Sequence, residues 1–325
     1  MKILNSYING NHKVIIFDDG TKIKETIDPN ADHFTYDFPE NFDIKITDYC
    51  DNGITRDGKV LPVCTYCHEN STPNGKHGNL HALEPMIKSL HAGTECAVGG
   101  GNALAHPDLL WFLEALKNQG VLANITINQR HLFQYKDLIC KLVAENLVHG
   151  IGVSLTDSSN MEDKEFIKSL GNNVVIHTIA GILSEKDLLF IDGMKVLILG
   201  YKDLRRGHAL LEKQGDEIHK NIEWLKTKLP ELRNSCKVIS FDCLGIEQLN
   251  PKELFHMSDE EYYSLFQGAD TDVFDNEGNI TCCTMYIDVE NMQVARMSTA
   301  ALDKRYAFTG NENISELLKL TTQGW

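Results

Sequence analysis

Strand-like and helix-like runs alternate along most of the chain, and this alternation restricts the possible folds more than any other feature of the sequence. Six apolar runs typical of buried strands, each followed by a helix-like segment, cover 42–50, 95–101, 122–129, 150–157, 173–182 and 194–203. A seventh strand-like run lies at 236–249, and in the first run Phe42, Ile44 and Ile46 share one face. Such alternation is typical of βαβ units around a parallel sheet. The sequence therefore predicts an α/β fold built as a partial (β/α)6-type, TIM-like barrel.

Two segments outside the alternation have the pattern of antiparallel β-structure. In residues 1–40, apolar and polar positions alternate, and Asn9-Gly10 and Asp19-Gly20 are turn dipeptides. This pattern predicts an N-terminal β-meander. Near the other end, residues 282–300 read as a β-hairpin that turns near Glu290-Asn291.

The chain has 325 residues, enough for one large domain or two ordinary ones. We expect three parts, which are an N-terminal β-meander at 1–40, a barrel core at 41–235 and a C-terminal extension at 236–325. The extension carries the predicted hairpin, and we expect it to complete the barrel and to cover the site.

Charge and hydropathy narrow the function classes. The formal net charge is −15, which argues against a broad nucleic-acid-binding surface, because phosphate binding needs clustered Lys and Arg. No N-terminal apolar stretch follows a basic start, so no signal peptide is predicted. No apolar run approaches the roughly 18 residues that a membrane span needs. We expect a cytoplasmic protein without a membrane partner.

Three of the nine cysteines gather in one segment after the first predicted strand. They are Cys50, Cys64 and Cys67. Structural disulfides are not expected in a reducing cytoplasm, which makes metal binding or catalysis the better explanation of a tight cysteine group. One reading is a structural zinc site with His68 or His77 as fourth ligand. The other is an iron–sulfur cluster that leaves one iron open, and ordinary buried thiols are the remaining alternative.

The position of this segment favours a functional reading. In a βα barrel, the loops that follow the strands meet at one rim, where active sites are built. The cysteine segment follows the first strand, and the glycine-rich stretch Gly99-Gly100-Gly101-Asn102 follows the second. Glycines allow a ligand to approach the backbone closely, although a tight strand-to-helix turn would also use them.

The cysteines resemble the cluster motif of the radical SAM superfamily. Cys50 ends the first strand, and Cys64-Thr-Tyr-Cys67 has an aromatic residue before its last cysteine. The family motif is usually Cys-x3-Cys-x2-Cys, whereas this chain has Cys-x13-Cys-x2-Cys, with about ten residues inserted at 54–63. The insertion consists of a turn with apolar flanks, which predicts a small hairpin or flap near the site. An inert surface excursion is the alternative, because loops tolerate insertions.

The resemblance extends to other loops of the same rim. The stretch at 99–102, followed by His106-Pro107-Asp108, is similar to the family's Gly-Gly-Glu-Pro stretch, which holds the amino group of S-adenosylmethionine. On this resemblance the S-adenosylmethionine-binding residues are Tyr66, Gly99, Gly100, Gly101, Asn102, Asn128, Ser154, Ile179 and Gly181. Tyr66 would meet the adenine through its backbone, Asn128 and Ser154 the ribose and carboxylate, and Ile179 and Gly181 would support the adenine. Taken singly, each of these is also explained as a strand-end or core residue.

The resemblance implies a reaction and its cofactors. Cys50, Cys64 and Cys67 would hold a [4Fe–4S] cluster, and S-adenosylmethionine would be cleaved reductively to a 5′-deoxyadenosyl radical that abstracts hydrogen from a peptide or small metabolite. A flavodoxin- or ferredoxin-type protein would donate the electron. A nucleotide or RNA substrate is one alternative. A zinc-stabilised βα binding protein without redox chemistry is another.

Further polar and thiol groups remain open. Arg205 and Arg206 could bind a substrate carboxylate or phosphate, or could be solvated charges at a helix start. Cys282 or Cys283 could donate a hydrogen atom to a product radical. The four C-terminal cysteines Cys236, Cys243, Cys282 and Cys283 could also ligate an auxiliary cluster, but core packing is the leading interpretation for each.

Overall fold

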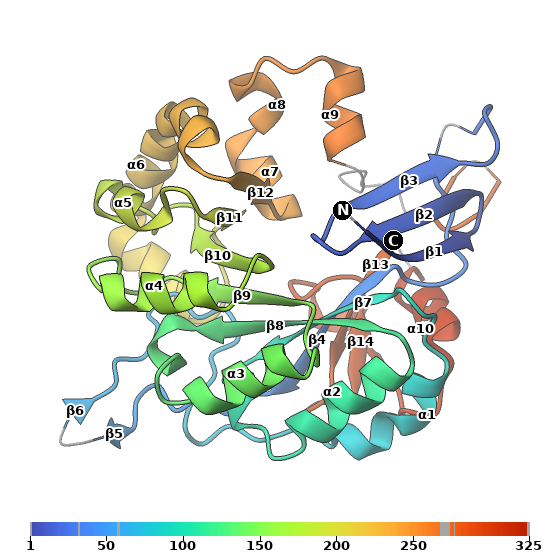
Figure 1. Ribbon diagram of the computed structural model, residues 1–325, viewed down its shortest axis with the longest axis horizontal. Coiled ribbons are helices and arrows are strands. Elements are labelled where there is room, and N and C mark those ends of the chain that lie inside the picture. Colours follow the sequence, from blue (N-terminus) through green and yellow to red (C-terminus); the bar gives the residue numbers. More distant parts are fainter. Residues whose placement is uncertain (1, 32, 57–58, 267–273, 276, 324–325) are drawn as a thin grey trace.

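The computed structural model describes residues 2–31, 33–56, 59–266, 274–275 and 277–323 (Figure 1). Its centre is one ten-stranded sheet. In spatial order the strands are β12 (Val238–Phe241), β11 (Lys195–Leu199), β10 (Val174–Ile179), β9 (Gly150–Ser154), β8 (Leu122–Asn128), β7 (Glu95–Gly100), β4 (Asn41–Thr47), β13 (Thr284–Asp288), β14 (Gln293–Ala295) and β15 (Tyr306–Ala307). The strands from β12 to β13 are all paired in parallel.

Helices follow the parallel strands, as the alternation predicted. They are α1 (Glu84–Lys88), α2 (Leu109–Asn118), α3 (Lys136–Ala144), α4 (Met161–Ser169), α5 (Leu188–Ile191), α6 (Arg206–Ser235), α7 (Cys243–Leu249), α8 (Pro251–Leu254), α9 (Asp259–Leu265) and α10 (Ile314–Thr321). Short 3-10 helices are η1 (Leu80–Leu83), η2 (Ala103–Ala105), η3 (Gln129–His131), η4 (Glu185–Asp187) and η5 (Leu302–Lys304). Figure 1 shows α1–α6 along the outer side of the curved sheet. The described helices include none with both the length and the apolar character that crossing a bilayer requires.

The main core lies between the sheet and these helices. Phe42, Ile44 and Ile46 of β4 are buried on this side, as their common face predicted. Apolar residues of the helices, such as Phe112 and Leu116 of α2, pack in the same cluster. Burial of such side chains contributes about 1.5–3 kcal/mol each, so this layer fixes the sheet that carries the rim loops.

Both predicted antiparallel segments are confirmed. The strands β1 (Ile3–Asn9), β2 (His12–Phe17) and β3 (Lys22–Thr26) form a separate meander. At the other end of the chain, β13 and β14 pair as an antiparallel hairpin. The hairpin joins the central sheet because β13 lies parallel to β4. Among the described residues no ladder connects β12 with β15, so closure of the barrel remains a prediction.

One expected strand is wrong over most of its length. The sequence pattern at 236–249 predicted a single strand, but only Val238–Phe241 forms β12, and α7 begins at Cys243. The side chain of Asp242 caps the helix by accepting a hydrogen bond from the N–H of Gly245 at 2.7 Å. An N-terminal cap of this kind starts a helix where apolar content alone does not distinguish helix from strand.

A buried charge network joins the meander to the start of β4. The Glu40 carboxylate lies 2.6 Å from His12 Nε2, 2.9 Å from Lys24 Nζ and 3.9 Å from Lys22 Nζ. Lys22 also contacts Glu95 at 3.1 Å. Burial opposes the charge on Glu40, but hydrogen bonds from His12 and Lys24 lower its pKa to about 2. The carboxylate is thus held by partners within the protein.

Candidate active site

The cysteine segment begins three residues after β4 and folds back against the end of that strand. The N–H of Cys50 donates to the carbonyl of Thr72 at 3.0 Å, and the N–H of Cys67 donates to the carbonyl of Cys64 at 3.3 Å. All three cysteines are free and half-buried. They therefore lie at the carboxyl end of the parallel strands, where the sequence analysis placed them.

The insertion between Cys50 and Cys64 forms the predicted small hairpin. Its strands are β5 (Thr55–Arg56) and β6 (Lys59–Val60), and the turn at 57–58 lies outside the described residues. Figure 1 shows the hairpin standing away from the central sheet. Whether it acts as a flap stays a prediction.

Several N–H donors surround the sulfur of Cys64. Asn52 Nδ2 and Asn128 Nδ2 each lie 3.7 Å from this Sγ, and Arg130 Nη1 lies 3.8 Å away. Burial raises the pKa of the Cys64 thiol, and the Arg130 charge opposes that rise. Donors of this kind stabilise a thiolate, which is the form that binds a metal.

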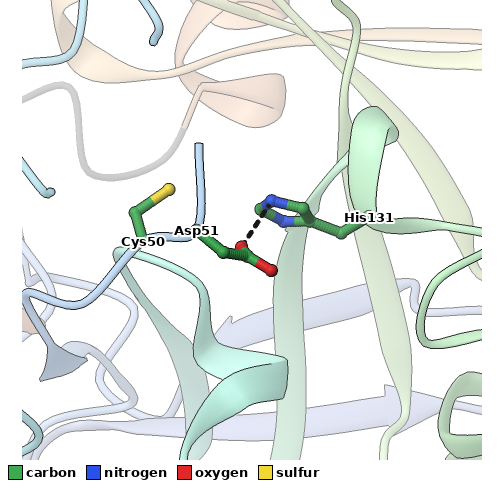
Figure 2. Close-up of side chains that lie close together, drawn as sticks. All are labelled: Cys50, Asp51 and His131. Atoms are coloured by element: carbon green, nitrogen blue, oxygen red, sulfur yellow. Dashed lines mark ion pairs between the residues drawn. The ribbon is translucent and has the colours of Figure 1, made fainter. Parts of the chain in front are cut away.

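Asp51 connects three rim loops next to Cys50. Figure 2 shows its carboxylate facing His131, whose Nε2 lies 2.9 Å from Oδ1. Asn102 Nδ2 also donates to Oδ1 at 2.9 Å, and Gln134 Nε2 donates to Oδ2 at 2.8 Å. Burial works against the charge, but hydrogen bonds from His131 and Gln134 hold the pKa of Asp51 below its usual range. The ends of β4, β7 and β8 are joined through this carboxylate.

The spacing of ligand atoms bears on the zinc alternative. In the described part of the chain, Cys50, Asp51 and His131 form the one group whose three ligand atoms all lie within 4.8 Å of one another. The oxygens of Asp51 already accept hydrogen bonds, so this group is accounted for without a metal. Cys50, Cys64 and Cys67 are not so close together. A tetrahedral zinc ion would hold thiolates about 3.8 Å apart, given its Zn–S bonds of about 2.3 Å.

The histidines proposed as a fourth zinc ligand have other partners. His68 Nε2 lies 3.2 Å from Glu69 and 3.4 Å from Lys202 Nζ. His77 Nδ1 is 2.9 Å from the hydroxyl of Thr47. Both imidazoles are thus engaged in hydrogen bonds to side chains other than the cysteines.

Gly99, Gly100 and Gly101 differ in the space that each would leave for a Cβ atom. A Cβ on Gly101 would lie 2.0 Å from the carbonyl oxygen of Tyr49, and one on Gly100, where φ is +116°, would lie 2.4 Å from that of Thr47. These two glycines are therefore required by the protein's own backbone. A Cβ on Gly99 would meet no atom within 4 Å, so Gly99 offers the open backbone that a ligand could approach.

Asn102 has structural partners. Its side-chain oxygen accepts from the N–H of Leu104 at 3.2 Å and caps η2, while its Nδ2 bonds Asp51. The side chain is buried. A direct contact of Asn102 with an amino group, which the resemblance implied, would have to compete with these bonds.

The remaining predicted ligand residues lie at strand ends along the same rim. Asn128 and Ser154 are paired neighbours at the ends of β8 and β9. Ile179 ends β10. Tyr66 lies between two cysteines, and burial raises its pKa to about 12. Gly181 has φ +85°, and a Cβ there would lie 2.7 Å from Ile218 of α6, so the fold itself requires this glycine.

The two arginines hold the cysteine segment. Arg205 Nη1 donates to the carbonyls of His68 and Glu69 at 3.1 and 2.8 Å, and Arg206 Nη2 donates to the carbonyl of Ser71 at 2.6 Å. The sequence analysis expected either substrate binding or solvated charges for Arg205 and Arg206, and neither expectation describes these bonds to the backbone. The start of α6 thereby fixes the chain immediately after the third cysteine.

Cys282 and Cys283, the candidates for donating a hydrogen atom to a product radical, lie away from the cysteine segment. Cys283 precedes β13, and its carbonyl accepts from the N–H of Glu40 at 3.0 Å, at the start of β4. The seven residues of β4 span about 20 Å, so Cys283 lies far from Cys50. Cys282 donates to the carbonyl of Thr284 at 3.3 Å. Both cysteines are buried, as core packing predicts.

Asp51, Arg130 and His131 are site residues that the sequence analysis missed. Asp51 directly follows a predicted metal ligand, and the other two come just after the third predicted strand. Their position after strand ends on the same rim was the available signal. Nothing in the sequence indicated that they would contact each other or Cys64.

Comparison with known proteins places the fold. No family model and no curated protein sequence matches this chain. The structure is similar to that of SuiB from Streptococcus suis bound to its precursor peptide SuiA, with a TM-score of 0.58 and 13% identity over 89% of this chain and 66% of SuiB. SuiB bound to S-adenosylmethionine gives a TM-score of 0.57 at 14% identity, over 90% of this chain and 67% of SuiB. The chain thus spans about two thirds of the length of SuiB and shares its fold, which is the fold of a protein that binds S-adenosylmethionine.

Proposed function

We propose that this protein is a radical SAM enzyme. The observation that carries the proposal is the position of Cys50, Cys64 and Cys67, which are free and half-buried at the rim of a parallel sheet whose fold is shared with SuiB. SuiB has been solved with S-adenosylmethionine. The spacing of the three cysteines and the engagement of His68 and His77 favour a cluster over a single zinc ion.

The donor set fits a [4Fe–4S] cluster. Cys50, Cys64 and Cys67 would each ligate one iron and leave the fourth open, since three thiolates are present. When bound, such a cluster supplies the electron for reductive cleavage of S-adenosylmethionine to methionine and a 5′-deoxyadenosyl radical, which abstracts hydrogen from the substrate. Asn52 and Arg130 donate toward the Cys64 sulfur and would favour its thiolate form.

The chain's own groups bind and orient the cosubstrate in this proposal. Gly99 offers open backbone at the end of β7, beside the Cys50 segment. Asn128 and Ser154 present polar side chains at the ends of β8 and β9 and would bind the ribose and carboxylate. Asp51 holds the loops that carry Cys50 and Asn102 at a constant separation.

A peptide is the favoured substrate class. SuiB has been solved with a precursor peptide, and that likeness supports a peptide over a nucleotide or RNA. The net charge of −15 supports the same choice. The electron donor in this proposal is a flavodoxin- or ferredoxin-type protein.

Anaerobic purification and cluster reconstitution test the proposal. We expect a brown protein with about four iron and four sulfide per chain. With dithionite and S-adenosylmethionine, this protein should release 5′-deoxyadenosine even without substrate, as measured by liquid chromatography with mass spectrometry. A colourless protein that retains zinc and releases no 5′-deoxyadenosine would establish the zinc-stabilised binding protein instead.

A further inference from the structure

Asp43 lies on the face of the central sheet that the helices do not cover. Its neighbours along β4, Phe42 and Ile44, are buried in the core on the helix side. Because side chains alternate along a strand, Asp43 points to the opposite, inner face. It is exposed there, although it lies in the middle of the sheet between β7 and β13.

The Asp43 carboxylate has no hydrogen bond or ion pair among the described residues. Neighbouring carboxylates differ in this respect. Asp242 accepts from the N–H groups of Gly200 and Gly245 at 2.8 and 2.7 Å. Glu69 lies within ion-pair distance of two basic side chains and a histidine. Asp43 is therefore the carboxylate of this group that remains available for a ligand.

The surroundings leave both space and unbalanced charge. The residue paired with Asp43 on β7 is Ala97, which has a small side chain. Although solvent reaches Asp43, protein atoms surround it on the inner face, and this partial desolvation raises the pKa of its carboxyl; Lys202 opposes this rise and Asp242 adds to it. The Lys202 amino group is engaged elsewhere, at 3.4 Å from His68 Nε2 and 3.2 Å from Ser298 Oγ. Asp43 thus has other carboxylates around it, and Lys202, the cation with the largest effect on it, has other partners; such a carboxylate favours a positively charged ligand.

We propose that Asp43 binds an ammonium or guanidinium group, and that the substrate therefore carries a basic side chain close to the site of reaction. That the ligand is a substrate rests on the proposed function, whereas cation binding itself does not. A charge-assisted hydrogen bond between the Asp43 carboxylate and a ligand cation is about twice as strong as a hydrogen bond between neutral groups. The inner face on which Asp43 lies belongs to the same strand that leads to Cys50.

Two small probes test the proposal without turnover. N-acetyl-lysine methylamide carries the cation, and N-acetyl-norleucine methylamide has a similar shape without charge. Binding to the iron-loaded protein is measured by saturation-transfer NMR. We expect the wild-type protein to prefer the lysine probe by about tenfold or more, the range of a hydrogen bond between charged groups. Asp43→Asn should abolish the preference, and Asp43→Glu should retain part of it.

The controls separate this proposal from the proposed function. Asp137→Asn, a change on α3 outside the site, should keep the wild-type preference. Iron content and substrate-free release of 5′-deoxyadenosine should be unchanged in Asp43→Asn, because Asp43 has no hydrogen bond or ion pair with Cys50, Cys64 or Cys67. Equal binding of the two probes by the wild-type protein, or a preference that survives in Asp43→Asn, would overturn the assignment, even if the protein proves to be a radical SAM enzyme.

Discussion

The two ends of β4 use polar groups in different ways. At the start, the Glu40 carboxylate contacts His12, Lys22 and Lys24, and the whole group is enclosed by the meander. At the other end, Cys50 is half-buried at a rim that remains partly exposed. A charge that is satisfied within the protein stabilises the fold, whereas ligand atoms held at an accessible edge are available for binding. One strand therefore leads from a stabilising charge network to the proposed cluster site, and mutations at its two ends should have separable effects.

The largest expected effect is at the cysteine end. Cys50→Ala should abolish the cluster, because the remaining two thiolates leave it under-ligated. Iron and sulfide analysis after reconstitution measures this loss. Cys140→Ala provides the matched control, since Cys140 is exposed on α3 and should leave both contents unchanged. Full iron in Cys50→Ala would contradict the assignment of the first ligand across the inserted hairpin.

The next largest effect is at the opposite end of the strand. Glu40→Gln should destabilise the protein by about 3–5 kcal/mol, because it leaves buried cationic partners without their carboxylate. Denaturant unfolding measures the change. Glu95→Gln should cost less, because Glu95 is partly exposed and contacts Lys22 alone within the network. At denaturant concentrations below its unfolding midpoint, the Glu40→Gln protein should still bind iron. Loss of iron from this folded protein would show that the two ends of β4 are coupled.

Gly99 and Gly101, beside the cysteine end of β4, allow stability and ligand binding to be tested separately, with smaller expected effects. Gly101→Ala should cost about 1–3 kcal/mol of stability, because the new Cβ would collide with the Tyr49 carbonyl. Gly99→Ala meets no atom within 4 Å and should leave stability nearly unchanged, while weakening S-adenosylmethionine binding. Thermal unfolding and equilibrium dialysis with labelled S-adenosylmethionine distinguish the two changes. Unaltered affinity in Gly99→Ala would remove Gly99 from the proposed binding site.

The smallest expected effect is a pH dependence that belongs to the Glu40 end. The folded-state pKa of Glu40 is about 2, below its ordinary value of 4.5. Its contribution to stability is therefore complete above about pH 4.5 and is lost as the pH falls towards 2. At pH 4 the expected loss is about 1 kcal/mol. The stability difference between wild type and Glu40→Gln should narrow accordingly between pH 6 and 4, and a constant difference would show that charge on Glu40 is not what stabilises this end.

Local patterns were enough to predict the strands, the meander and the hairpins. The alternation in β4 predicted that Phe42, Ile44 and Ile46 would share a buried face, and the insertion between two cysteines predicted a small hairpin. These features depend on neighbouring residues, whose periodicity and turn preferences act over a few positions. The extent of β12 was not predictable in this way, because the cap at Asp242 decides it.

The sequence by itself also placed Cys50, Cys64 and Cys67 at one rim, because all three follow the same strand. Only the tertiary structure decided which polar groups are satisfied. The contacts of Asp51 with His131, of Arg206 with Ser71 and of Glu40 with Lys24 join segments that lie far apart in the chain. Asp43 shows the same limit, since its sequence context marks it only as a strand position on the face opposite Phe42, Ile44 and Ile46. Its lack of a partner depends on side chains that strands and loops far away in the sequence bring to the inner face, and a pattern that repeats every two residues carries no information about them.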